Sequence, residues 1–276
     1  MTQPVVLVTG CSSGIGHEAV HHLRNKGALV VATARQPQAL KHLAAPGKVE
    51  TARLDVASDA DRAAVVTDVL ERHGRIDGLV NNAGYGFTLA AEDTSADAMR
   101  TLFETNLFGL HDLTRRVLPT MRAQGSGRIV NVSSIAGHVS VPMMSAYCAS
   151  KFALRALSQA MHTEVRRFGI HVALVEPGVI KTDFPQRSQA ETRGAGIDLA
   201  ASPYAAFYAK WGRMRLNQRG AHPRVIARRI AHACLAKRPR FHYFGPWYDA
   251  KAGNVVKRLL PDALLNAGMR AYFRGR

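Results

Sequence analysis

Short runs of β-branched and other apolar residues alternate with longer amphipathic stretches over the first two thirds of the chain. The predicted strands are Val5–Val8, Leu29–Ala34, Val49–Leu54, Gly78–Asn81, Arg128–Val132 and His171–Val175. The predicted helices between them are Ile15–Lys26, Asp59–Arg72, Thr101–Arg122 and Ser150–Phe168. Almost continuously apolar strands that alternate with helices form parallel sheets covered on both faces. The pattern therefore predicts an α/β fold built on a single doubly wound parallel sheet.

This alternation breaks down after Gly178. A polar stretch rich in arginine and alanine leads to a predicted helix at Pro223–Lys237 and to one more strand-like run at Arg240–Phe244. Neither internal repeats nor low-complexity tracts interrupt the chain, so solenoid and linker interpretations have no support. We therefore expect one domain over residues 1–276, with a basic and partly helical C-terminal extension at 246–276.

Composition and charge narrow the function classes. The 276 residues are 47% hydrophobic and 21% charged, which suits one large core and excludes disorder as the main state. The formal net charge is +17, of which +3 lies up to Pro185 and +14 lies beyond it. Such asymmetry is typical either of a surface that meets polyanions or of an arginine-rich soluble surface, and the sequence leaves both open.

The cysteines and the N-terminus bear on the compartment. Cys11, Cys148 and Cys234 are odd in number and widely spaced, which offers neither a disulfide framework nor a zinc knuckle and suits a reducing cytosol. The chain enters its first strand without the pattern of a secretory signal, and no apolar run approaches the ~18 residues that span a bilayer. We expect a cytoplasmic protein that is at most peripheral to a membrane.

A glycine-rich turn, Thr9-Gly10-Cys11-Ser12-Ser13-Gly14-Ile15-Gly16, follows the first strand and opens the first helix. Glycines permit a tight turn and let the backbone approach a pyrophosphate, whose charge the free N–H groups of the helix N-terminus stabilise. The position of the turn between strand and helix favours a nucleotide site.

The glycine spacing and several independent motifs resemble the short-chain dehydrogenase/reductase family. The resemblance extends from Val5 to about Thr182. The further motifs that carry it are Leu54-Asp55-Val56, Asn81-Asn82-Ala83-Gly84, Asn106, Ser134, Tyr147-Cys148-Ala149-Ser150-Lys151, and Pro177-Gly178 followed by Thr182. The turn and the segment Tyr147–Leu154 are most similar to the branch that contains 17β-hydroxysteroid and retinol dehydrogenases.

The resemblance implies a Rossmann-type fold and a nicotinamide cofactor. Asp55 corresponds to the family residue at the adenine ring, and Asn82–Gly84 to the segment under a ribose, whereas Asn81 is expected to brace the sheet. Thr182 corresponds to the residue at the nicotinamide carboxamide, although a helix N-cap is the competing interpretation. The implied cofactor-binding residues are Gly10, Ser12, Ser13, Gly14, Ile15, Gly16, Asp55, Val56, Asn82, Ala83, Gly84, Tyr147, Lys151, Pro177, Gly178, Val179, Ile180 and Thr182.

Arg35 distinguishes the two nicotinamide cofactors. In a Rossmann-type domain the end of the second strand faces the adenosine ribose, where a carboxylate would repel a 2′-phosphate. Here that strand ends in Ala34-Arg35, and a guanidinium offers charge-assisted, bidentate hydrogen bonds to phosphate. Arg35, with Ser12 and Ser13, therefore favours NADP(H) over NAD(H); the competing interpretation is an ordinary surface arginine.

The catalytic set implied by the resemblance is Asn106, Ser134, Tyr147 and Lys151. Tyr147 and Lys151 are four residues apart, so they share one face if a helix begins near Tyr147. Lowering a tyrosine pKa from ~10 by about three needs about 4 kcal/mol, which a nearby ammonium and the nicotinamide charge can supply. Tyr147 would exchange the proton, Ser134 would hold the substrate oxygen, and Asn106 would anchor a water that relays protons to Lys151. The side chain of the neighbouring Ser133 should point away.

Apolar residues around the catalytic positions suggest the substrate class. Val141, Met143 and Met144 are predicted to bind the substrate together with Ser134 and Tyr147, and residues 183–220 correspond to the family's substrate lid. That stretch contains Phe184, Tyr204, Phe207, Tyr208, Trp211 and Met214. These residues suggest a hydrophobic carbonyl or alcohol that resembles a steroid, a retinoid or a lipid. The histidines never fall at metal-ligand spacing, so we predict no metal site.

Three functional classes remain in competition. An NADP(H)-dependent oxidoreductase is favoured because the whole catalytic set is present, whereas a non-catalytic NADP-binding sensor on the same fold would generally lack part of it. A nucleic-acid binder lacks any recognisable reading motif. We also expect a homodimer or homotetramer formed through Thr101–Arg122 and Ser150–Phe168. The basic residues of 246–276 could contact an anionic membrane surface, or the same stretch could simply pack on the protein.

Overall fold

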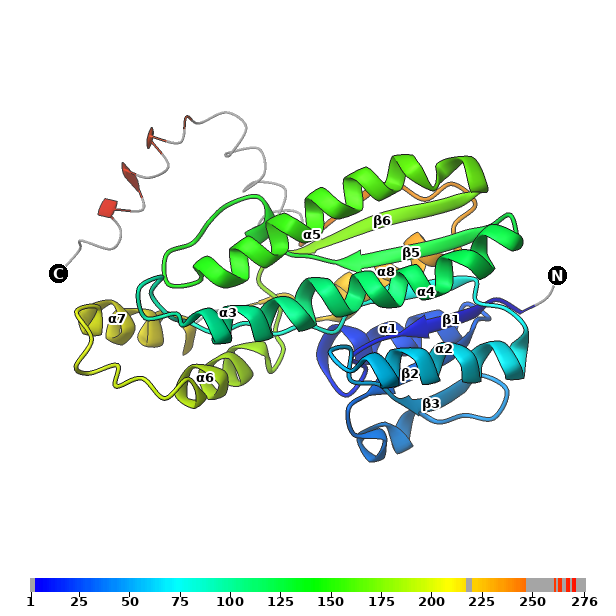
Figure 1. The fold of residues 1–276 in the computed structure, drawn as a ribbon, viewed down its shortest axis with the longest axis horizontal. Coiled ribbons are helices and arrows are strands. Elements are labelled where there is room, and N and C mark those ends of the chain that lie inside the picture. The colour runs from blue at the N-terminus through cyan, green and yellow to red at the C-terminus, as the bar shows by residue number, and fades with distance from the viewer. Residues whose placement is uncertain are drawn as a thin grey trace.

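The described residues form one seven-stranded parallel sheet (Figure 1). The computed structural model describes residues 3–216, 220–246, 261, 263–264, 267–268 and 270–271. The strand order is β3-β2-β1-β4-β5-β6-β7, so the order reverses between β1 and β4. The strands are β1 (Val5–Val8), β2 (Leu29–Ala34), β3 (Val49–Arg53), β4 (Gly78–Asn81), β5 (Gly127–Val132), β6 (Ile170–Pro177) and β7 (His242–Gly245). The predicted doubly wound fold is confirmed.

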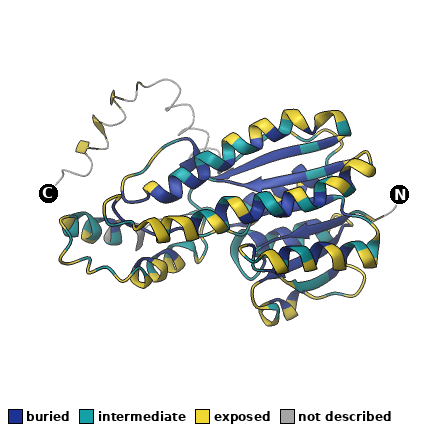
Figure 2. Ribbon diagram, in the orientation of Figure 1, coloured by how far each residue is buried: buried dark blue, intermediate teal, exposed yellow. Residues whose placement is uncertain are grey.

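Each face of the sheet packs against its own helical layer. Val6 and Val8 belong to a core with α1 (Gly14–Arg24) and α8 (Arg224–Leu235). Val5 and Leu7 point the other way, into a core shared with three further helices. Those helices are α2 (Asp59–His73), α4 (Gly109–Ala123) and α5 (Ser145–Glu164). Figure 2 shows the strands buried between the two layers, and each buried aliphatic side chain contributes about 1.5–3 kcal/mol.

The predicted helix Thr101–Arg122 is interrupted in the structure. It consists of α3 (Ala96–Phe103), a π-helical turn η2 (Glu104–Phe108) and α4. A Cβ at Gly109 would lie 1.9 Å from the carbonyl oxygen of Val56, so α4 packs on this loop closer than any side chain allows. Such π turns widen a helix locally and often carry functional residues. Here the turn carries the buried Asn106.

Sequence periodicity missed one 3₁₀ segment that packs against β2 and β3 and two helices that lie away from the sheet. These are the 3₁₀ segment η1 (Pro37–Leu43) and the helices α6 (Phe184–Gly194) and α7 (Ala205–Leu216). Figure 1 shows α6 and α7 beyond the carboxyl ends of the strands, rather than on a face of the sheet. The helices α6 and α7 belong to one long insertion whose two ends are hydrogen-bonded to each other. Lys181 N donates to Ala221 O (2.9 Å) and Ala221 N donates to Val179 O (3.1 Å). We call residues 182–220 the α6–α7 segment.

Most of the predicted extension at 246–276 lies outside the described residues. Within the part of the chain that is described, no helix is both long and apolar enough to span a membrane.

Candidate active site

The glycine-rich turn is shaped by contacts that exclude any side chain. Gly10 has a φ of 71°, and a Cβ there would lie 2.9 Å from the Cα of Ala83. A Cβ at Gly16 would lie 2.3 Å from the carbonyl oxygen of Gly10. Glycine is therefore required at both positions, the first by its positive φ and the second by the close approach of helix and turn.

Thr9 and Asn82 lock this turn to the loop after β4. Thr9 Oγ1 accepts hydrogen bonds from the backbone N–H groups of Asn82 (3.0 Å) and Ala83 (2.9 Å). Asn82 Nδ2 donates back to the carbonyl oxygens of Thr9 (2.9 Å) and Gly10 (3.0 Å). The turn and Asn82–Gly84 thus lie against each other, and the anchoring role of the Thr9 hydroxyl could not be read from the spacing.

A phosphate group fits the N-terminus of α1. The N-cap residue Ser13 makes no side-chain capping bond, and the first turn of α1 carries no acidic residue. Unpaired N–H groups and the helix dipole favour an anion there. The glycine turn and this uncapped helix end are the features that a dinucleotide pyrophosphate requires.

Arg35 extends from the end of β2 and is exposed. Among the described residues it forms neither a hydrogen bond nor an ion pair, so its guanidinium is available for an anion. The electrostatic influence of Arg35 also reaches Tyr85. Burial and the charge of Glu191 raise the pKa of the Tyr85 hydroxyl, and Arg35 works in the opposite direction.

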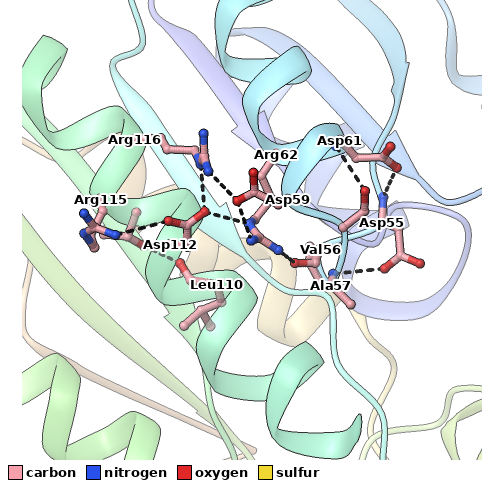
Figure 3. Close-up of polar contacts among 12 residues, drawn as sticks. Asp55, Val56, Ala57, Asp59, Asp61, Arg62, Leu110, Asp112, Arg115 and Arg116 are labelled. Carbon is pink, nitrogen blue, oxygen red and sulfur yellow. Dashed lines mark hydrogen bonds and ion pairs between the residues drawn. The ribbon is translucent and has the colours of Figure 1, made fainter.

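Charged residues of α2 and α4 support the loop that carries Asp55 and Val56 (Figure 3). Asp55 Oδ1 accepts from the backbone N–H of Ala57 at 3.0 Å. The buried Arg62 of α2 donates from Nη1 to the carbonyl oxygen of Val56 (2.7 Å) and from Nε to Asp112 of α4 (2.8 Å). Hydrogen bonds from Arg116 and Arg62 lower the pKa of Asp112, although burial alone would raise it. This network holds α2, α4 and the predicted adenine-contacting loop in one arrangement.

Tyr147 and Lys151 lie on the same face of α5, as predicted. Lys151 Nζ is 5.7 Å from the centroid of the Tyr147 ring, and both residues are buried. The ammonium donates to the carbonyl oxygen of Val132 at 3.1 Å, its only hydrogen bond among the described residues. Burial lowers the pKa of Lys151 to about 8. An ammonium has three N–H groups, so two remain for ribose hydroxyls or for Tyr147.

Ser134 is the N-cap residue of the short 3₁₀ turn η3 (Ile135–Gly137) and lies two residues after the end of β5. Its Oγ accepts from the backbone N–H of Ala136 at 3.1 Å. Ser133 behaves as expected for its alternating position, because its hydroxyl points to the carbonyl oxygen of Lys151 at 3.5 Å. Ser134, rather than Ser133, is the serine that remains available to a substrate.

A buried carboxylate holds the turn that carries Ser134, and sequence reasoning missed it. Glu176 of β6 is fully buried and bonds His138, four residues after Ser134, and His242 of β7 (2.8 Å). Both histidines lower the pKa of Glu176, against the rise that burial alone would cause. No motif links these three positions, so only the three-dimensional contact reveals them.

Asn106 fixes the backbone that follows Gly84. Its Nδ2 donates to the carbonyl oxygen of Tyr85 (2.9 Å) and to Ser150 Oγ (3.1 Å), and its Oδ1 accepts from Tyr85 N (3.1 Å). A Cβ at Gly84 would lie 3.1 Å from Asn106 Oδ1 and 3.6 Å from Lys151 Nζ. Asn106 and Lys151 therefore converge beneath Gly84.

The segment after β6 closes over the glycine turn. Gly178 N donates to the carbonyl oxygen of Gly245 at 2.7 Å, which joins the start of this segment to β7. A Cβ at Gly14 would lie 3.2 Å from Thr182 Cγ2. Thr182 Oγ1 also accepts from Phe184 N at 3.3 Å, at the start of α6, whose N-cap residue is Asp183. Thr182 thus accepts a hydrogen bond from the first residue of α6, although it lies one residue before the N-cap residue Asp183.

A third apolar cluster lies over Tyr147. The rings of Phe184 and Tyr147 are 5.6 Å apart, and a Cβ at Gly86 would lie 2.8 Å from Tyr147 Cδ2. The requirement for glycine at Gly86 could not be anticipated from the sequence. The cluster includes the predicted substrate-site or covering residues Val141, Met144, Tyr147, Phe184, Tyr208 and Trp211.

Other predicted covering residues behave differently. Met143 is buried in the left-handed region with a φ of 67°, a strained conformation for a side chain of this kind. Tyr204 and Phe207 contact each other, with ring centroids 6.4 Å apart, and neither belongs to the cluster over Tyr147.

Cys148 is a buried thiol whose pKa is raised by burial, so it behaves as a packing residue.

Hydrogen bonds from residues 88–93 fasten the α6–α7 segment. Thr88 N donates to Thr192 Oγ1 (2.9 Å), and Ala90 N donates to the Tyr208 hydroxyl (2.9 Å). The Asp93 carboxylate accepts from Ser202 (2.7 Å) and Tyr208 (2.6 Å). The α6–α7 segment is thus attached at both helices to one short loop.

Metal ligation has no support in the described ranges, which contain no group of three or more suitable His, Cys, Asp or Glu side chains.

Comparison with known proteins agrees with this geometry. A family model described as short chain dehydrogenase matches residues 4–193. The chain is 32% identical to 3-ketodihydrosphingosine reductase of Bacteroides thetaiotaomicron, over 99% of both chains. It is 32% identical to human 17-beta-hydroxysteroid dehydrogenase type 1, over 88% of this chain and 78% of that protein. A crystal structure of a short-chain dehydrogenase from Streptomyces avermitilis matches with a TM-score of 0.80 and 34% identity, over 99% of this chain and 96% of that one.

The seven-stranded sheet, the glycine turn before α1 and the match over most of the chain agree with one another. The similarity to a 17-beta-hydroxysteroid dehydrogenase is consistent with the branch that the motifs indicated. The chain therefore belongs to the short-chain dehydrogenase/reductase family of oxidoreductases, whose members bind a nicotinamide cofactor.

Proposed function

We propose that this protein is an NADP(H)-dependent oxidoreductase that interconverts a hydrophobic ketone or aldehyde and its alcohol. The observation that carries the proposal is the buried Lys151 ammonium beside Tyr147 on one face of α5. Burying a cation costs desolvation free energy, and this ammonium has no acidic partner among the described residues. A charge kept at this cost next to a tyrosine is typical of a group that stabilises the phenolate form.

The proposed mechanism assigns one task to each side chain. The nicotinamide, when bound, supplies or accepts the hydride. Tyr147 gives its proton to the carbonyl oxygen in reduction and takes it back in oxidation. Ser134 donates a hydrogen bond to the same oxygen, and Lys151 binds a ribose hydroxyl and favours ionised Tyr147. Asn106 holds the backbone beneath Gly84, where a water would connect Lys151 to solvent.

The preference for NADP(H) rests on Arg35. Its exposed guanidinium at the end of β2 forms no ion pair within the described residues, and a 2′-phosphate would give it a doubly charged, bidentate partner. The pyrophosphate would lie over the glycine turn and the α1 N-terminus, and the adenine would lie beside Asp55 and Val56.

The substrate class rests on the apolar cluster over Tyr147. We propose that the α6–α7 segment is the substrate lid, with Phe184 and Tyr208 facing a lipophilic substrate together with Val141 and Met144. The similarity to a 3-ketodihydrosphingosine reductase supports a ketone that carries a long apolar group.

The direct test measures turnover by the absorbance of the reduced cofactor. Steroid, retinoid and long-chain keto substrates are offered with NADPH and, separately, with NADH. We expect NADPH-dependent reduction by the wild type and none by Tyr147→Phe. Binding of NADPH without turnover of any of these carbonyls would favour the sensor interpretation instead.

Two partner proposals remain. We propose a cytoplasmic homodimer or homotetramer formed through α4 and α5, and contact of the basic residues of 246–276 with anionic lipid. Co-sedimentation with anionic and neutral vesicles, for the full chain and for a chain that ends at Asp249, tests the second. Equal binding of both chains would contradict it.

A further inference from the structure

Arg187 of α6 reaches across the site to the phosphate-binding turn. Its Nη2 donates to Ser13 Oγ at 2.7 Å, a contact between residues 174 positions apart. Ser13 is the N-cap residue of α1, yet its hydroxyl does not cap that helix. The Arg187 side chain, which belongs to the α6–α7 segment, thus contacts the turn where a nucleotide phosphate would bind.

The charge of Arg187 has no acidic partner in the described parts of the chain. The side chain is exposed, and the Ser13 contact is its only hydrogen bond there. The helix that carries it is held in place by its neighbours, because the next residue, Ser188, is buried and Thr192 Oγ1 accepts a hydrogen bond from Thr88 N. The guanidinium therefore sits over the α1 N-terminus on a fastened helix.

A neutral hydroxyl is a weak partner for a guanidinium, whereas a phosphate offers charge and bidentate geometry. We propose that Arg187 binds the pyrophosphate of the nicotinamide cofactor, next to Ser13. The pyrophosphate is the relevant phosphate because it lies at the N-terminus of the first helix in this architecture, whereas the 2′-phosphate belongs to the strand end that carries Arg35. The inference rests on the proposed cofactor-dependent function.

The consequence concerns the active site as well as the cofactor. Phe184 is three residues before Arg187 on α6, and its ring lies 5.6 Å from the ring of Tyr147. Cofactor binding thereby holds in place the helix that covers Tyr147.

The test compares Arg187→Gln with Arg193→Gln. Both substitutions remove one exposed positive charge from α6, but Arg193 lies in its last turn and makes no contact with the glycine turn. Dissociation constants for NADPH and NADH are measured by titration without substrate. We expect Arg187→Gln to weaken both cofactors by the same factor of about ten, and Arg193→Gln to leave both within about twofold. The cofactor affinity of Arg187→Lys should lie between those of the wild type and Arg187→Gln, because lysine keeps the positive charge but loses the bidentate geometry of the guanidinium.

Amide hydrogen exchange of Phe184–Gly194 supplies a second measurement. We expect NADPH to protect these amides in the wild type and in Arg193→Gln, and much less in Arg187→Gln at equal cofactor occupancy. Loss of NADPH affinity alone would reassign Arg187 to the 2′-phosphate, and unchanged affinity for both cofactors would remove it from the cofactor site. A wild-type protein that binds neither cofactor would overturn the proposed function itself, which is a separate outcome.

Discussion

Lys151 and Tyr147 lie one turn apart on α5, with the Lys151 ammonium 5.7 Å from the centre of the Tyr147 ring. Burial lowers the pKa of this lysine from 10.5 to about 8. A difference of about 2.5 between the two pKa values corresponds to a cost on the order of 3 kcal/mol for keeping the charge at neutral pH. The folded protein is therefore less stable than it would be with an apolar residue at this position.

The first prediction concerns that cost. We expect Lys151→Met to raise the free energy of unfolding of the cofactor-free protein at pH 7 by about 1–2 kcal/mol, because loss of the bond to Val132 O offsets part of the gain. Between pH 8 and 10.5 the folded wild type loses its proton while the unfolded chain retains it, so wild-type stability rises with pH. The advantage of the variant should shrink over this range in denaturant titrations. A constant difference from pH 7 to 10.5 would show that Lys151 is not destabilised by burial.

The second prediction separates the roles of the catalytic pair. Tyr147→Phe should abolish turnover and leave the dissociation constant for NADPH nearly unchanged, because only the transferable proton is lost. Lys151→Ala should reduce both turnover and NADPH affinity, since the ammonium serves the ribose and the tyrosine. Steady-state kinetics and equilibrium titration measure the two effects. Equal loss of affinity in both variants would contradict this division.

The third prediction concerns Arg35. Replacement by aspartate puts a repulsive carboxylate where a 2′-phosphate would bind, so Arg35→Asp should reverse the cofactor preference. A charged hydrogen bond contributes about 1.5–3 kcal/mol, which corresponds to a change of about ten to more than a hundredfold in the NADPH to NADH ratio of kcat/KM. A wild type that already prefers NADH would show that Arg35 is an ordinary surface residue.

The fourth prediction concerns Thr9. Thr9→Val keeps the shape of the side chain but removes the acceptor of two backbone N–H groups. We expect a loss of about 1–3 kcal/mol in the free energy of unfolding, because those groups stay partly buried without a partner. NADPH affinity should fall with it, since the same bonds hold the glycine turn against Asn82–Gly84. Thr9→Ser, which retains the hydroxyl, is the control and should behave almost like the wild type.

The fifth prediction concerns assembly. Phe108 precedes α4 and is 51% exposed, which leaves an apolar ring that a partner subunit would cover. We expect sedimentation to show a species of at least twice the 30.0 kDa chain mass, and Phe108→Asp to shift it toward the monomer. A wild type that sediments only as a monomer would exclude self-association through α4 and α5.

The sequence predicted those parts of the fold and site that depend on local patterns. The bounds of β1, β2 and β4 match the predicted runs, because buried parallel strands are apolar at every position. The glycine turn and the pair Tyr147 and Lys151 are likewise local in sequence. By contrast, α7 has apolar residues distributed around its circumference and packs on a loop rather than on the sheet, so its periodicity is weak. The contact of Glu176 with His138 and His242 joins segments far apart in the chain, and neither composition nor spacing encodes it.

The fastening of α6 and α7 to residues 88–93 has a kinetic consequence. Thr88 is hydrogen-bonded to α6, and Ala90 and Asp93 are hydrogen-bonded to α7, so opening of the whole segment requires the loss of hydrogen bonds at both helices. The loop and the two helices should therefore behave as a single cooperative unit that unfolds locally before the sheet does. A bulky substrate would then enter when this whole unit loosens, and the frequency of that event would set an upper limit on turnover.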